Sequence, residues 1–139
     1  IETLHKYEDY IIKKNIHVTT LRDYININEI KHITICKIDT EGTDYLVIKG
    51  LQEYLESKFV DYIIFEYHAP SHEKIKDILY SKGYSIYYMV RNEEILVDSL
   101  EKYPKNSKSL LNLIAVSSEK KNIFLKNFVM EFKSENTSH

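Results

Sequence analysis

The amino-acid sequence predicts an α/β fold, in which helices pack against a central sheet. Short apolar, β-branched segments alternate with segments whose apolar residues recur every three to four positions. The length of 139 residues suits one domain with its own hydrophobic core. The single cysteine, Cys36, stands in an apolar run without a metal-ligand spacing, so neither a disulfide framework nor a structural zinc site is indicated.

The composition indicates a soluble protein of a reducing compartment. The formal net charge is −2 and charges of both signs are interspersed, which argues against DNA or RNA binding. No apolar run approaches the roughly 20 residues of a membrane-spanning helix, and no signal-like segment opens the chain. We therefore expect a cytoplasmic protein without nucleic-acid or membrane partners.

The first elements are two helices and a strand. Residues 1–15 predict a helix through the apolar stripe Leu4, Tyr7 and Ile11. Thr20 and Asp23 match the S/T-x-x-D/E pattern of a capped helix start, so a short second helix is expected from Thr20. The apolar run "ITICKID" (Ile33 to Asp39) predicts a strand buried on both faces.

A second strand and two helices follow. One helix ends near Ser57, and its apolar stripe consists of Val47, Ile48, Leu51, Tyr54 and Leu55. The run "VDYIIFEYH" (Val60 to His68) predicts another buried strand. Pro70 then opens a helix that Gly83 ends as the residue after its cap.

The last part of the chain predicts more strands and a covering helix. "YSIYYMV" (Tyr84 to Val90) is expected to turn at Arg91-Asn92 into the short strand "EILV". "LLNLIAVS" (Leu110 to Ser117) is the fourth main strand. A helix over 119–133 would cover the sheet with Phe124, Leu125, Phe128, Val129 and Phe132. The domain is expected to span residues 1–132, and residues 133–139 a disordered tail.

Alternating strands and helices predict parallel strands, right-handed crossovers and helices on both faces of the sheet. In such sheets ligands bind beyond the carboxyl ends of the strands. Asp39 and Glu41 follow the first strand, while Glu66 and His68 end the next. Both groups are therefore expected at the same rim of the sheet.

The loop after the first strand allows several interpretations. Asp39 ends the strand and is favoured as a ligand-binding or catalytic residue. Glu41 is equally compatible with such a role and with complementing the dipole of the following helix. For Asp44, in the first helical turn, the dipole interpretation is preferred. Gly42 permits a tight turn or a close backbone approach to a ligand.

The end of the second strand also leaves alternatives open. Glu66 either pairs with a cation such as Lys37 of the neighbouring strand or faces the ligand, because an unpaired buried carboxylate would be costly. His68 and His72 are four residues apart, but Pro70 lies between them and is expected to break the helical face that joint metal ligation needs. No metal site is predicted.

Several short motifs resemble, in order and spacing, the second half of the FkbM-family methyltransferases. They lie between Val18 and Val116 and are "VTTLRDYI", "CKIDTEGTDYLVIKGL", "IIFEYH", "KGY" and "LNLIAV". The family pattern K-I-D-x-E-G-x-E with a later K-G is matched by Lys37, Asp39, Glu41, Gly42, Lys49 and Gly50. Asp44 stands where the family has Glu, and Arg22 replaces the first acid of the family's T-L-D-D.

The resemblance implies a partial class I methyltransferase sheet, which is Rossmann-like, with strands four to seven and their flanking helices. In such enzymes a glycine-rich loop after the first strand binds S-adenosylmethionine. This chain has only three glycines, Gly42, Gly50 and Gly83, and none is close enough to another to form that loop. The N-terminal half with the cofactor loop is therefore expected to be absent, and activity of this chain alone is not expected.

The resemblance also implies roles for the rim residues. The reaction would transfer a methyl group to a substrate oxygen, most often a hydroxyl, of a small molecule or sugar. Asp39 would lie near the methyl donor or acceptor, and Gly42 beside the cofactor. Glu41 would orient the substrate or the loop, and Glu66 and His68 would act on the acceptor side, where a histidine offers proton transfer near neutral pH.

Two alternatives stay open from the sequence. The chain could be an inactive half-domain that serves as a binding module and pairs, as a dimer or with another protein, through an exposed sheet edge. It could also be a metal-dependent hydrolase that uses Asp39, Glu41, Glu66 and His68, although this reading leaves the "TLRD" and "KG" matches unexplained.

Overall fold

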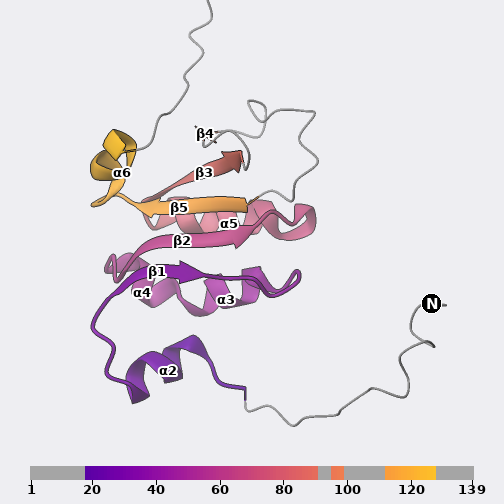
Figure 1. Ribbon diagram of the computed structural model, residues 1–139. Helices are drawn as coiled ribbons and strands as arrows, with labels where there is room; N and C mark the ends of the chain where they lie inside the picture. Colours follow the sequence, from indigo (N-terminus) through magenta and orange to yellow (C-terminus); the bar gives the residue numbers. More distant parts are fainter. Residues whose placement is uncertain (1–17, 91–94, 99–111, 128–139) are drawn as a thin grey trace, which may run out of the picture.

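The computed structural model describes residues 18–90, 95–98 and 112–127 (Figure 1). The elements are α2 (Leu21–Ile27), β1 (Ile33–Lys37), α3 (Asp44–Gly50), α4 (Gln52–Glu56), β2 (Val60–Glu66), α5 (Ala69–Ser81), β3 (Tyr84–Val90), β4 (Ile95–Val97), β5 (Asn112–Ser117) and α6 (Lys121–Asn127). The α/β class is confirmed. The helix expected over 1–15, the end of the last helix and the tail lie outside the described residues.

Within the described ranges, five strands form one mixed sheet in the order β1-β2-β5-β3-β4. β1 and β2 are parallel, and Ile35 lies opposite Tyr62. β5 runs antiparallel to both β2 and β3, so β2 and β3 point the same way, as the predicted crossover requires. β4 pairs antiparallel with β3, as expected from the predicted turn. The last strand thus enters the middle of the sheet.

The two faces of the sheet are covered by different helices. Figure 1 shows α3, α4 and α5 on one side of the sheet, with α6 at the end where β5 finishes. Neighbouring residues of a strand point to opposite faces. Accordingly, Ile63 and Phe65 join the core beneath α3 and α5, whereas Tyr62 packs against Phe124 of α6 with ring centroids 5.8 Å apart.

Local signals place the helix ends where the sequence predicts them. The hydroxyl of Thr20 accepts a hydrogen bond from the backbone N–H of Asp23 at 3.1 Å and caps α2. The predicted helix over the second apolar stripe is confirmed as α3 and α4, which meet at the fully buried Leu51. Gly83 follows the cap of α5 with φ +74°.

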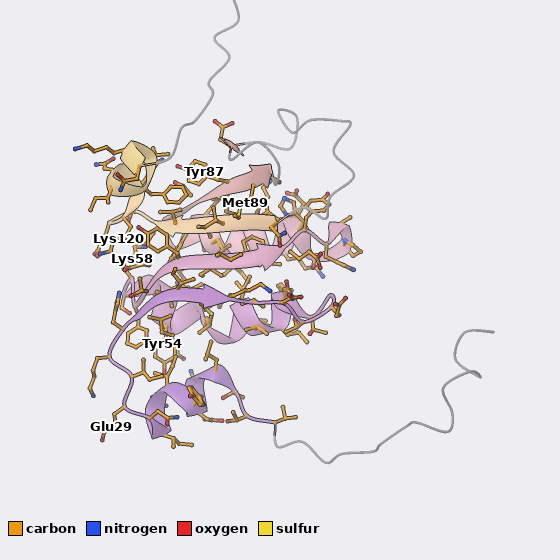
Figure 2. All side chains as sticks on the ribbon, viewed as in Figure 1. Glu29, Tyr54, Lys58, Tyr87, Met89 and Lys120 are labelled. Atoms are coloured by element: carbon orange, nitrogen blue, oxygen red, sulfur yellow. The ribbon has the colours of Figure 1, made fainter. Side chains whose placement is uncertain are left out.

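Helix α2 lies along the β1 edge of the sheet, below β1 in Figure 1. Figure 2 shows Tyr54 of α4 between the sheet and α2. Its hydroxyl donates a hydrogen bond to the side-chain oxygen of Asn26 at 3.2 Å. This contact helps to fix α2 against the layer formed by α3 and α4.

The expectation that β1 is buried on both faces is wrong. Ile35 is 60 % exposed, and Thr34 and Lys37 are exposed as well. The physical reason is position, because β1 is the edge strand among the described residues and no described helix packs over Ile35. In the described ranges, no helix is long and apolar enough to cross a membrane.

Candidate functional site

The loop between β1 and α3 makes a tight left-handed turn. Glu41 has φ +50° and Gly42 has φ +95°, a backbone region that side-chain-bearing residues seldom adopt. A Cβ on Gly42 would lie 3.3 Å from Nε2 of His68. The turn therefore needs glycine at position 42 both for its backbone angle and for the close approach of the histidine ring.

Asp39 lies two residues after the end of β1 and is paired with a lysine of the strand. Its Oδ2 is 2.5 Å from Nζ of Lys37, and both side chains are about half exposed. The hydrogen bond and charge of Asp39 raise the pKa of Lys37, and the charge of Glu66 raises it further. Lys37 therefore forms its ion pair with Asp39 and not with Glu66. The charge of Glu66 has only the smaller effect on the pKa of the lysine.

A pocket of about 710 Å³ opens beside Asp39, between α2, β1 and α3. Its volume falls within the range of small-molecule sites, roughly 300 to 1,000 Å³. Among the side chains and backbone that line it are Thr20, Arg22, Lys37, Asp39, Thr40 and Gly50. The pocket lies at the carboxyl end of β1, where ligands of open α/β sheets bind.

The other predicted rim residues do not line this pocket. Glu66 is half-buried at the end of β2, opposite Asn112 of β5. His68 is exposed at the cap position of α5, with its ring against Gly42. Glu41 is exposed on the loop. The structure thus brings His68 and Gly42 together and places Asp39 at the pocket.

The reason given for doubting a joint metal site of His68 and His72 is wrong. Pro70 stands in the first turn of α5, where proline is well tolerated, and the helix continues to Ser81. His72 is 3 % exposed and its Nε2 lies 2.9 Å from the hydroxyl of Tyr88, so it faces the core while His68 faces solvent. In the described part of the chain, no group of three or more His, Cys, Asp or Glu side chains could hold a metal ion.

Asp44 is buried and hydrogen-bonded, which the sequence did not predict. It is 3 % exposed, and its Oδ1 accepts hydrogen bonds from the backbone N–H and the hydroxyl of Thr40 at 3.0 and 2.5 Å. Its Oδ2 accepts a bond from the backbone N–H of Glu66 at 3.3 Å. Asp44 lies in the first turn of α3, as predicted, and its carboxylate in addition joins two segments of the chain.

The sequence did not predict that residues at the start of α2 line the pocket. Thr20 was predicted as a helix cap, and nothing in the pattern showed that it would line a pocket with Arg22. Arg22 forms an ion pair with Glu53 of α4. The "TLRD" match was the available signal, since it marked this short helix as part of a family pattern.

Comparison with protein-family models identifies the family. The model described as Methyltransferase FkbM domain matches residues 2–86, more than half of the chain. This chain belongs to the FkbM methyltransferase family. Searches of the curated proteins and of the solved structures found no match.

The FkbM match differs in extent from the resemblance found in the motifs. It begins at residue 2, so it includes the segment before Val18, and it ends at residue 86, before β5. Every candidate site residue lies within it, namely Asp39, Glu41, Gly42, Glu66 and His68. The family membership therefore supports methyl transfer as the class of activity, and it leaves the roles of these residues as predictions.

Proposed function

We propose that this FkbM chain is the C-terminal portion of an S-adenosylmethionine-dependent methyltransferase that methylates a hydroxyl group of a small molecule or sugar. The observation that carries the proposal is the pocket beside Asp39, at the carboxyl end of β1. This pocket lies within the segment that matches the FkbM domain. The acceptor class is taken from the family resemblance.

The sheet topology supports a class I, Rossmann-like arrangement. The strands of both crossovers, β1 to β2 and β2 to β3, run in the same direction with helices between them. No described strand pairs with the outer side of β1. Further parallel strands could therefore extend the sheet there, next to the pocket.

The residues present fit one side of a cofactor site. The pocket is large enough for a nucleoside-sized ligand, and Asp39 offers a carboxylate to its polar groups. The sequence has no two glycines close enough for a phosphate-type or nucleoside-binding glycine loop. We infer that residues of another segment complete the site.

In this proposal the chain's own residues align the acceptor and remove its proton. S-adenosylmethionine supplies a methyl group activated by its sulfonium charge. Asp39 accepts a hydrogen bond from the acceptor hydroxyl and holds its oxygen in line, and Lys37 keeps that carboxylate in place through their ion pair. Glu66 and His68 are the groups on the neighbouring strand end that could take up the proton.

A binding module without activity is the second candidate. The observation in its favour is the edge strand β1, where Ile35 is 60 % exposed and no described strand pairs. The hydrolase alternative gains no such support, because the described residues contain no metal-binding cluster and Asp39 is paired with Lys37.

The variant Asp39→Asn tests the proposed function. In the natural polypeptide that contains this chain, we expect methyl transfer to fall by about 10²-fold or more, because the neutral amide loses the ion pair with Lys37 that keeps the side chain in place to align the acceptor hydroxyl. The measurement is release of S-adenosylhomocysteine with a panel of free sugars and phenols as acceptors.

Asp77→Asn is the matched control, since Asp77 is an exposed carboxylate on α5. It should leave the rate unchanged. An Asp39→Asn enzyme with the rate of the wild type would contradict the role of Asp39. Titration calorimetry of this chain alone with S-adenosylmethionine should show no binding, and measurable binding would mean that no further segment is needed.

A further inference from the structure

The carboxylate of Asp44 is the polar group that connects the two candidate catalytic segments. A buried carboxylate is costly unless several donors satisfy it. Asp44 has three such donors, two from Thr40 and one from the backbone of Glu66. Thr40 adjoins Asp39 and Glu41 in the loop after β1, whereas Glu66 ends β2 two residues before His68.

The position of Asp44 in the sheet explains why such a link is needed. The last hydrogen bond of the ladder between the two strands runs from the backbone N–H of Ile38 to the carbonyl of Ile64 at 2.8 Å. After Ile38 the segment that follows β1 moves away from β2 and turns back into α3. The Oδ2 of Asp44 then accepts the hydrogen bond of the Glu66 N–H. The side chain thus continues the connection where the strand ends.

The same carboxylate fixes the shape of the loop. Its Oδ1 accepts hydrogen bonds from the backbone N–H and the hydroxyl of Thr40. The hydroxyl of Thr43 closes the turn by donating a hydrogen bond to the carbonyl of Thr40 at 3.0 Å. Two left-handed residues, Glu41 and Gly42, lie inside this hydrogen-bonded turn. The turn would lose its central acceptor without Asp44.

We propose that Asp44 is a positioning residue of the methyl-transfer site, which holds the loop of Asp39 against the strand end of Glu66 and His68. The inference rests on the proposed function. Asp44 is not itself a catalytic residue, because it is buried and its two oxygens are engaged by the protein. It acts through the positions of the groups on the two segments that it joins.

The variant Asp44→Asn is the central test. The amide of asparagine has one oxygen, which cannot accept hydrogen bonds from both Thr40 and Glu66. Its NH₂ group would face the donors of one of these residues and form no hydrogen bond with them. We expect the backbone amides of Thr40 and Glu66 to exchange with deuterium at least about 10-fold faster than in the wild type. In the natural polypeptide we expect kcat to fall by about 10²-fold while the KM for S-adenosylmethionine changes little.

Two further variants separate positioning from general stability. Asp44→Glu keeps two carboxylate oxygens and is the residue of the family pattern, so it should recover most of the lost kcat. Asp77→Asn removes an exposed carboxylate of α5 and should change neither exchange nor kcat. If Asp44→Asn does not fold, Thr40→Val removes the hydroxyl donor to Asp44 and should lower kcat in the same direction.

Each outcome decides a defined part of the inference. Unchanged exchange at Thr40 and Glu66 would show that Asp44 does not hold the two segments. Faster exchange with unchanged kcat would show that the link has no catalytic consequence. If the wild-type polypeptide transferred no methyl group, the proposed function and the catalytic part of this inference would both fail, and the exchange data would still decide the structural part.

Discussion

At the scale of single residues, buried polar side chains connect neighbouring elements of this FkbM chain. Asp44 joins α3 to the end of β2, and the hydroxyl of Tyr84 donates a hydrogen bond to the carbonyl of Val60 at 2.5 Å. His72 of α5 is bonded to Tyr88 of β3. Because an unmatched buried polar group is costly, such pairs specify which elements lie side by side.

The pair of His72 and Tyr88 makes stability depend on pH at both ends of the scale. Burial lowers the pKa of His72, and burial raises the pKa of Tyr88 to about 12. The folded state therefore prefers the neutral form of both groups. Below about pH 6.5 the unfolded chain binds a proton at His72 more readily, and above about pH 10 it releases one from Tyr88 more readily, so stability falls in both directions.

We expect His72→Gln to flatten the acid limb of this profile. Glutamine offers hydrogen-bonding groups toward Tyr88 but does not titrate. The urea midpoint of the wild type should drop between about pH 6.5 and 5, and that of the variant should drop less. Tyr88→Phe is the companion variant, because it keeps His72 and removes the titrating phenol. Equal acid slopes for wild type and His72→Gln would contradict the prediction.

At the scale of elements, two glycines at the ends of helices differ in backbone conformation. Gly83 follows α5 with φ +74°, which glycine adopts without strain. Gly50 ends α3, and nothing lies within 4 Å of the place where its Cβ would be. The two positions therefore respond in opposite ways to the same substitution.

We expect Gly83→Ala to destabilise the chain by about 1 to 2 kcal/mol, because a left-handed residue with a Cβ is strained. Its Cβ would also lie 3.0 Å from Nζ of Lys58. Gly50→Ala, the matched control, should stabilise by about 0.5 to 1 kcal/mol, since alanine favours a helix and finds open space there. Urea unfolding of both variants measures the difference, and a stabilising Gly83→Ala would contradict the argument.

At the scale of the whole molecule, the described sheet has two unlike edges. At one edge β4 forms a hairpin with β3. At the other, no described strand pairs with the outer side of β1, and Ile35 of this strand is exposed. Sheet edges with exposed apolar side chains invite association with other strands. This edge is where further strands of a larger methyltransferase, or a second copy of the chain, could pair.

We expect this chain, studied alone, to self-associate through the β1 edge at high concentration. Ile35→Lys should weaken the association by about 10-fold or more, because an isoleucine side chain buried in a contact contributes at least about 1.5 kcal/mol. Sedimentation velocity measures the change. Ile27→Lys is the control, since Ile27 is an exposed isoleucine on α2; equal effects of both variants would place the contact elsewhere.

The sequence by itself determined the class of the fold, most of the elements and the candidate residues after β1 and β2. These features depend on local signals: apolar periodicity, the cap at Thr20 and the glycine at position 83. The family membership also came from the sequence, because the pattern around Asp39 and Gly42 is a contiguous motif.

Only the tertiary structure decided the exposure of β1, the place of β5 and the hydrogen-bond partners of Asp44. The burial of a strand depends on which elements cover it. The apolar pattern around Ile35 is compatible with both a central strand and an edge strand. β5 enters between β2 and β3 through pairing of residues far apart in sequence. From the sequence, Asp44 is recognisable only as an acidic residue at a helix start. Its hydrogen bond with the backbone N–H of Glu66 forms only when the two strands lie side by side.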